Sequence, residues 1–181
     1  MSDFYNHYQQ KLKPELAKQL GITNIMAVPK LSKIVINTGL GEALINKKAI
    51  ENMSNQLAAV SGQKPIVTCS KKDIFSFKLR KGDPIGLKVT LRGRRMYDFL
   101  EKFVKITLPR IRDFRGVSNS GFDDRGSFTL GLREQIVLPE IEYSRIDKIR
   151  GLEITFVITT KDKNHTKKLL EILGMPFKKE L

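Results

Sequence analysis

The polar side chains of segment 85–95 are spaced so that they can bind a polyanion. Lys88, Thr90 and Arg92 alternate with leucine and valine, and this period of two predicts a β-strand with one buried side and one solvent-facing side. Ammonium, hydroxyl and guanidinium groups in one row can contact phosphates and sugar hydroxyls. The solvent-facing side of this strand is therefore predicted to bind a polyanion, and RNA fits best.

A second cationic segment, 71–84, combines lysine and arginine with aromatic residues. Cations neutralise phosphates while aromatic rings pack on sugars or bases, so this combination is typical of RNA-binding loops. The alternative is that Phe75, Phe77 and Leu79 enter the core and the cations only solvate the loop. We expect a long, exposed and partly mobile loop, because the segment is too basic and too weakly periodic for a core element. Its cations are Lys71, Lys72, Lys78, Arg80 and Lys81.

The charge of the whole chain supports a polyanionic partner. The net charge is +14 and the isoelectric point is near 9.9, which favours nucleic acid or an anionic membrane surface over a merely soluble basic protein. Residues 71–115 hold 14 basic and 5 acidic side chains, whereas residues 116–181 hold 11 and 10. The concentration of the excess in one quarter of the chain indicates a localised binding surface.

Size and composition predict a single domain, 1–181, with a sizeable core. The chain has 181 residues, of which 40% are hydrophobic, too many for a disordered chain. No apolar run is long enough to span a membrane or to form a signal peptide, so a cytoplasmic protein without a membrane partner is expected. The single cysteine, Cys69, excludes an intramolecular disulfide and is expected to be a small buried residue.

No pattern typical of catalysis, of a metal site or of a cofactor is present. The glycines of segment 37–44 lack the third fingerprint glycine and a following Gly-Lys-Ser/Thr, which argues against a nucleotide site. They are expected to let the backbone approach a phosphate or a duplex groove. His7 and His165 lie far apart, and the acidic residues of segment 123–142 are interleaved with arginines, as is typical of satisfied surface charges.

The apolar periodicity predicts four helices and five strands. Pro14 interrupts the first helix and Gly21 ends it, Gly62 ends the second, and Asp162 or Asn164 caps the last. Ser2 or Asp3 is the expected cap of the first helix, and Pro109 is expected at or just beyond the end of the third. The helices are expected at 4–20, 46–61, 94–108 and 164–173, and the strands at 31–37, 65–70, 85–92, 127–132 and 152–160.

These elements favour an α+β fold with an antiparallel or mixed sheet, helices packed on one face and an RNA-binding opposite face. Hydroxyl and amide groups on that face are expected to bond ribose hydroxyls and base edges, and cations to meet phosphates. The residues expected there are Lys33, Asn37, Lys88, Thr90, Arg92, Thr155 and Thr159.

Long motifs of the chain resemble those of the large-subunit ribosomal protein L-five family in its bacterial form, over nearly the whole length. Where that family commonly has FDGRGNY, this chain has FDDRGSF (122–128), so the turn at Asp124 is expected to differ locally, and the loop at 73–76 also varies. The matching stretches are KIVINTGLGEA (33–43), LAAVSGQKPIVTCSKK (57–72), FKLRKGDPIGLKVTLRGRRMYDFLEKF (77–103), FDDRGSFTLGLREQIVLPEI (122–141) and RGLEITFVITT (150–160).

The resemblance implies a non-enzymatic, monomeric constituent of the large ribosomal subunit. It implies binding of 5S rRNA in the central protuberance, together with other 5S-associated proteins, and contacts to the large rRNA, to P-site tRNA and, across an intersubunit bridge, to the small-subunit S-thirteen protein. Segment 118–133 is the expected bridge surface. With Lys88 added from the strand pattern, the implied 5S rRNA contacts are Lys33, Asn37, Thr38, Gln63, Lys88, Thr90 and Arg92. The implied tRNA-contact loop comprises Lys71, Lys72, Phe77, Lys78, Arg80, Lys81 and Gly82.

Two other classes stay open. A general RNA chaperone, or the binding domain of an RNA-modifying enzyme, predicts little discrimination among RNAs or a need for a cofactor. A protein-interaction module whose basic patch meets an acidic partner predicts binding that survives ribonuclease treatment.

Overall fold

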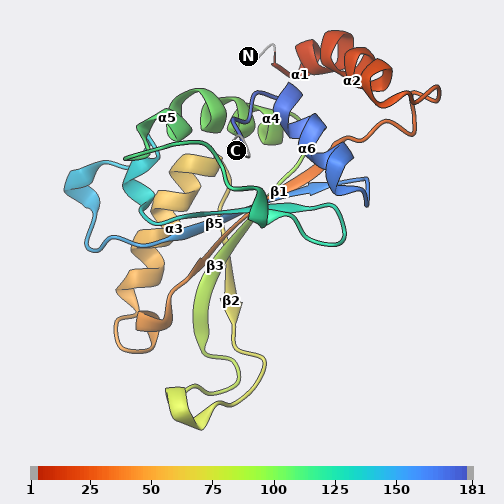
Figure 1. The fold of residues 1–181 in the computed structure, drawn as a ribbon. Coiled ribbons are helices and arrows are strands. Elements are labelled where there is room, and N and C mark those ends of the chain that lie inside the picture. Colours follow the sequence, from red (N-terminus) through yellow and green to blue (C-terminus); the bar gives the residue numbers. More distant parts are fainter. Residues whose placement is uncertain (1–3, 179–181) are drawn as a thin grey trace. The chain divides into compact units, whose positions relative to one another are not determined.

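A five-stranded antiparallel sheet with helices packed on it organises the chain, in the strand order β2-β3-β1-β5-β4 (Figure 1). The computed structural model describes residues 4–178, apart from the side chain of Arg145. The predicted α+β class is confirmed, and each of the five expected strands is present. They are β1 (Leu31–Gly39), β2 (Ile66–Cys69), β3 (Pro84–Leu91), β4 (Phe128–Leu132) and β5 (Leu152–Ile158).

The helices lie close to the predicted ranges. Gly21 and Gly62 end the first two helical segments in the left-handed conformation, and the Asp162 carboxylate caps α6 by accepting from the Asn164 amide at 2.8 Å. The caps expected at Ser2 or Asp3 lie outside the described residues. The helices are α1 (Phe4–His7), α2 (Lys13–Leu20), α3 (Lys48–Ser61), α4 (Gly93–Lys102), α5 (Leu108–Arg110) and α6 (Lys163–Ile172).

Two helical segments contain a π-helical turn ahead of a proline, which the periodicity did not predict. Residues Tyr8–Leu12 precede Pro14, and residues Phe103–Thr107 precede Pro109. Proline has no N–H to donate and its ring clashes with the carbonyl four residues earlier. A wider turn relieves this clash. The first segment continues past Pro14 to Leu20, whereas the second ends at Arg110, directly after Pro109 and close to its expected end.

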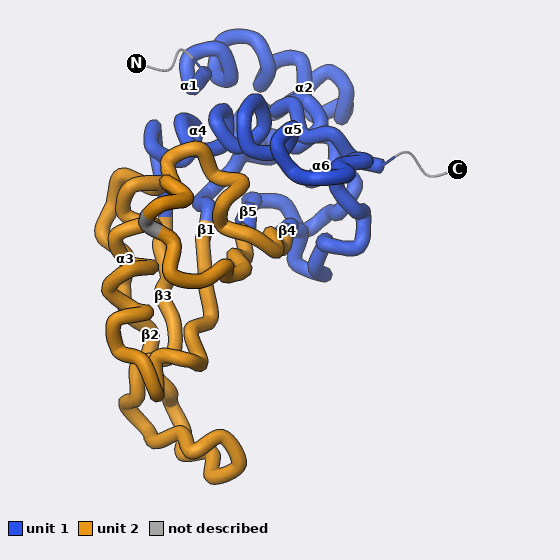
Figure 2. The backbone as a smooth tube through the Cα atoms, turned by 90° about the vertical axis from the view of Figure 1, so that its left-hand side faces the viewer, with its two compact units in different colours: residues 1–34, 91–130, 155–181 blue, residues 35–90, 131–154 orange. Residues whose placement is uncertain are grey.

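The described chain forms two compact units, each built from separate stretches of sequence (Figure 2). Unit 1 comprises residues 1–34, 91–130 and 155–181, and unit 2 comprises residues 35–90 and 131–154. β1, β3, β4 and β5 each contribute residues to both units. The single folding domain expected from the length remains a prediction.

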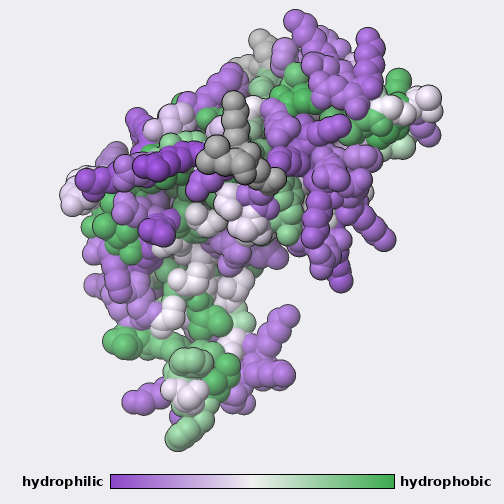
Figure 3. Space-filling model, in the orientation of Figure 1, coloured by the Kyte–Doolittle hydropathy of each residue, from purple (hydrophilic) through white to green (hydrophobic). Residues whose placement is uncertain are grey.

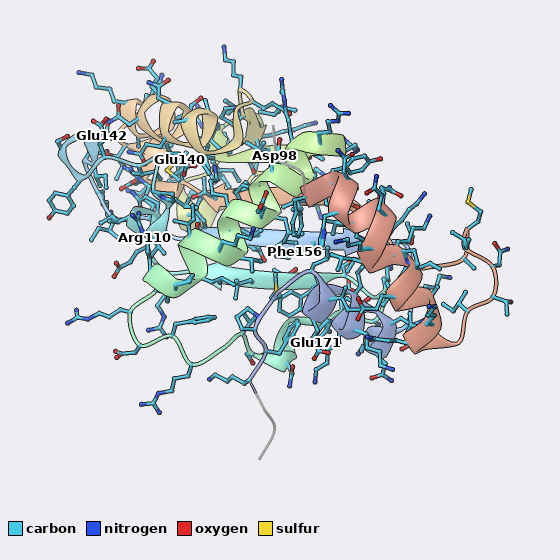
Figure 4. The ribbon with its side chains drawn as sticks, turned by 90° about the horizontal axis from the view of Figure 1, so that it is seen from above. Asp98, Arg110, Glu140, Glu142, Phe156 and Glu171 are labelled. Carbon is cyan, nitrogen blue, oxygen red and sulfur yellow. The ribbon has the colours of Figure 1, made fainter. Side chains whose placement is uncertain are left out.

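Aromatic side chains form much of the core of unit 1. Phe156 of β5, labelled in Figure 4, lies with its ring centroid 6.0 Å from that of Phe103 and 6.3 Å from that of Phe128. Tyr8 packs against Tyr97 of α4 with 5.2 Å between the ring centroids. These contacts pack the helical segments 4–20 and 93–110 within this unit, and burial raises the pKa of Tyr8 to about 12.

Unit 2 packs α3 along its strands (Figure 2). Met53 and Leu57 of α3 are fully buried, as are Leu87 and Val89 of β3. Cys69 is exposed, so the expectation that it is buried was wrong. It ends the edge strand β2, where the register with β3 shifts, and an edge position leaves one side of the residue uncovered.

Within residues 4–178, no helix has the length and apolar character needed to cross a membrane.

Candidate nucleic-acid interface

The β3 strand presents the alternation that its sequence predicted. Leu87 and Val89 are buried, whereas Lys88 between them is exposed and Thr90 is half-buried. One side of β3 therefore faces the core of unit 2, and the other side presents an ammonium and a hydroxyl group.

The β1 strand divides Asn37 from Thr38. Asn37 is half-buried, whereas Thr38 is only 2% exposed and lies on the buried side with Ile36. The Thr38 hydroxyl donates a hydrogen bond to the Gly151 carbonyl at 2.9 Å. The Thr38 hydroxyl thus fixes β1 from the buried side of the strand. Asn37 presents its amide on the opposite, open side.

The β2 strand completes the open side of unit 2. Ile66 pairs with Lys88 and Thr68 pairs with Gly86, and directly opposed residues of paired strands share a face. Ile66 is 69% exposed, so an aliphatic surface lies beside the Lys88 ammonium. We name the open side formed by Asn37, Ile66, Thr68, Lys88 and Thr90 the unit 2 sheet face. The half-buried Gln63 lies on the connection between α3 and β2.

The neighbours of Gly86 leave no room for a side chain at this position. The sequence alone did not reveal this constraint. A Cβ atom at Gly86 would lie 2.7 Å from the Thr38 carbonyl oxygen and 2.8 Å from the Thr68 hydroxyl oxygen. Gln63 follows the glycine that ends α3, and its backbone is held by Ser61, whose hydroxyl donates to the Gln63 carbonyl at 2.9 Å. The close strand contact shapes this face.

The remaining predicted sheet-face residues belong to unit 1. Lys33 is half-buried, and Arg92 is exposed at the residue preceding α4. The Thr155 hydroxyl lies 3.1 Å from that of Thr129, and the Thr159 hydroxyl accepts from the Lys30 amide at 3.1 Å. Both threonine hydroxyls therefore make bonds inside the protein, whereas Lys33 and Arg92 leave cations at the surface.

The basic loop is an extension of the β2–β3 hairpin. Phe75 is 100% exposed and Phe77 is 71% exposed at its tip, so the alternative that these rings enter the core was wrong. Leu79 is half-buried and forms a bridge with Ile74. The loop lies at the lower end of the view in Figure 3, where hydrophobic and hydrophilic side chains lie together on the surface.

Acidic side chains of the loop stabilise its backbone and do not neutralise its cations. The Asp73 carboxylate accepts from the Lys81 amide at 2.7 Å, and the Asp83 carboxylate accepts from the Arg80 amide at 2.7 Å. In the part of the chain that the structure describes, no ion pair involves the loop cations, and all of them are exposed together with Gly82: Lys71, Lys72, Lys78, Arg80 and Lys81. The loop thus presents its positive charge to solvent.

An ion-pair cluster that the sequence pattern did not predict stabilises unit 2. The Arg150 guanidinium binds both oxygens of Asp147 at 2.7 Å each, and its Nε lies 2.6 Å from the Glu42 carboxylate. Lys148 pairs with the same Glu42 at 2.8 Å. Hydrogen bonds from Arg150 hold the pKa of Asp147 well below its usual range, and those from Lys148 and Arg150 lower the pKa of Glu42.

Further acidic side chains of the described residues pair within the protein or line a cleft. Asp124 pairs with Lys163 at 2.9 Å, and Asp123 accepts backbone amides of its own turn from Arg125 and Ser127. Glu140 and Glu142 lie on the segment between β4 and β5 (Figure 4) and line a cleft of about 240 Å³ with amide side chains of α3. Nowhere in residues 4–178 do three His, Cys, Asp or Glu side chains gather as metal ligands.

An α+β sheet with one open polar face and a basic hairpin with exposed aromatic rings is typical of nucleic-acid-binding proteins. The comparisons with known proteins narrow this class. Residues 24–80 match the family model described as "Ribosomal protein L5", and residues 84–177 match the model that describes the C-terminus of the same ribosomal family. The chain belongs to the ribosomal protein L5 family, whose members are structural ribosomal proteins and not enzymes.

Individual relatives are similar over almost the whole chain. The protein named large ribosomal subunit protein uL5 of Desulfatibacillum aliphaticivorans is 54% identical over 179 residues, covering 99% of this chain and 100% of the relative. Its counterpart of the same name from Caldanaerobacter subterraneus has the same identity and coverage. The one from Symbiobacterium thermophilum is 53% identical over 177 residues, covering 98% of each chain.

Proposed function

We propose that this chain is a structural constituent of the large subunit of the cytoplasmic ribosome, where it binds 5S rRNA and attaches it in the central protuberance. The observation that supports this most strongly is the unit 2 sheet face. One side of β3 packs against the core, while Lys88, Thr90 and Asn37 remain accessible on the other side. Asn37, Gln63 and Thr90 select the RNA through sugar and base-edge contacts, and Lys88, Lys33 and Arg92 supply affinity through phosphates.

The basic hairpin loop contacts P-site tRNA in this proposal. Its cations are unpaired within the described chain, and two exposed phenylalanine rings at the tip suit contact with sugars or bases. Because the loop carries its own backbone hydrogen bonds, its removal leaves the sheet face in place.

Further contacts complete the proposed placement. The chain is a monomer within the ribosome, touches the large rRNA and lies beside other 5S-associated proteins. Segment 118–133 meets the small-subunit S-thirteen protein in an intersubunit bridge. This segment exposes charges of both signs, including Asp123 and Arg125, and so can form complementary ion pairs with a protein partner.

Alanine variants of the sheet face test the 5S rRNA proposal. Asn37→Ala and Thr90→Ala each remove a polar partner of the RNA, with an expected loss of about 1–3 kcal/mol of binding free energy. Fluorescence anisotropy with labelled 5S rRNA measures this loss. Gln10→Ala, an exposed amide outside the face, is the matched control. Wild-type affinity of both sheet-face variants would remove the support for this face.

Deletion of residues 72–81 tests the division of labour. The deletion is expected to leave 5S rRNA binding nearly unchanged and to weaken tRNA binding to ribosomes that carry the variant. Loss of 5S rRNA binding on deletion would show that the loop is assigned to the wrong RNA.

A further inference from the structure

Unit 1 contains a groove that neither the sheet face nor the basic hairpin explains. It has a volume of about 660 Å³ and lies along α2 and the turn that follows it. Its lining is mainly apolar and includes Pro14, Ala17, Ile22 and Ile25. Cavities of this size hold several side chains or a small molecule.

The apolar surface continues outside the groove. Ile25 is 63% exposed and Met26 is 84% exposed on the turn after α2. Figure 3 shows hydrophobic surface at the upper right, where α2 lies in Figure 1. A hydrogen bond within the turn holds it, since the Asn24 side chain accepts from the Met26 amide at 2.9 Å. Contiguous apolar surface rimmed by polar residues is typical of protein interaction sites.

The charges at the groove have a single sign. Lys13 and Lys18 line it, and no carboxylate does. Neither lysine forms an ion pair within residues 4–178. Lysine stems cover apolar surface while their ammonium groups stay in water. The two positive charges can therefore pair with anionic groups at the groove.

We propose that this groove binds a segment of a partner protein in which an aliphatic or aromatic side chain is flanked by carboxylates. The apolar side chain enters the groove beside Ala17 and Ile25, and the carboxylates pair with Lys13 and Lys18. RNA fits this groove less well, because nucleic-acid interfaces are polar and strongly positive, whereas this lining is mainly apolar with two cations. None of the residues that line the groove is among the proposed RNA contacts.

Selection from a phage-displayed library of random dodecapeptides on the 181-residue chain tests the proposal. The expected consensus is a leucine, isoleucine or phenylalanine next to aspartate or glutamate. The selected peptide is then titrated by fluorescence anisotropy against Lys13→Glu/Lys18→Glu and against Ile25→Ser. Each variant is expected to weaken binding by about tenfold or more, because one introduces repulsion and the other removes apolar contact. Lys11→Glu, an exposed charge reversal outside the groove lining, is the matched control.

Three outcomes overturn the proposal: no enriched peptide, a basic consensus, or peptide binding that the groove variants leave unchanged. A parallel titration with 5S rRNA identifies the competing class of partner. A larger loss of RNA affinity in Lys13→Glu/Lys18→Glu than in Lys11→Glu, per charge reversed, would make the groove an RNA surface and also overturn the proposal. Equal losses per charge, together with peptide binding that depends on the groove, support it.

Discussion

Replacing Gly86 by alanine is expected to destabilise unit 2 at its sheet face. The added Cβ would lie 2.7 Å from the Thr38 carbonyl oxygen, whereas ordinary contacts begin at 3.4 Å. The strands must therefore separate by about 0.7 Å at this point, or the Gly86 backbone must move by that amount. Because the nearest atom belongs to a backbone and not to a flexible side chain, we expect a cost of about 1–3 kcal/mol in the free energy of unfolding.

Urea unfolding of the wild type and the variant measures this cost. The midpoint is expected to fall while the m-value is unchanged, and the melting temperature to fall by about 2–4 °C for each kcal/mol. Gly39→Ala is the matched control in the same unit, because a Cβ at Gly39 of β1 meets nothing within 4 Å. Equal stability of Gly86→Ala and Gly39→Ala would refute the close strand contact on which the expected cost depends.

Three further predictions concern unit 2. Arg150→Met leaves the Asp147 carboxylate without its guanidinium partner, and because that carboxylate is partly exposed we expect a loss of about 1–3 kcal/mol in urea unfolding. Lys148→Met, which removes an exposed cation, is expected to lower the free energy of unfolding by less than about 1 kcal/mol. Similar losses for Arg150→Met and Lys148→Met would contradict the stabilising role of Arg150. The pKa of Asp147 is lower when folded, so its contribution to stability is present above about pH 4 and is lost as the pH falls toward the folded pKa. Asp147→Asn is expected to reduce the acid-induced loss of stability, and an unchanged pH profile would contradict this. Thr38→Val removes the bond to the carbonyl of Gly151, the residue before β5, and is expected to cost about 1 kcal/mol in urea unfolding, while 5S rRNA affinity stays near that of the wild type. A specific loss of affinity would place Thr38 at the RNA.

The sequence pattern predicts the helices and strands well, because the formation of each element depends mainly on residues close together in the chain. The alternation around Lys88 and Thr90 predicts which side of β3 is exposed, and the structure confirms it. The same period of two separates Asn37 from Thr38. Thr38 entered the expected RNA contacts only through the family resemblance, and its buried hydroxyl fits a structural role better.

Features that depend on distant residues are not visible in the sequence pattern. Arg150 and Glu42 are 108 positions apart, and nothing near either residue indicates that they pair. Gly86 lies inside β3 beside the register shift with β2, and the crowding that excludes a side chain comes from two other strands. Cys69 belongs to a strand-like run that begins with Ile66 and Val67, but its place on the edge strand leaves it exposed.

The most direct test of the central claim is a competition gel shift with the wild-type chain. Labelled 5S rRNA is bound at near-physiological salt and challenged with unlabelled 5S rRNA, tRNA and random-sequence RNA. We expect unlabelled 5S rRNA to displace the probe at far lower concentration than the other two, because sugar and base-edge contacts of the sheet face add selectivity to phosphate binding. Equal displacement by all three RNAs would mean that the positive charge alone governs binding, and would contradict a dedicated 5S rRNA interface.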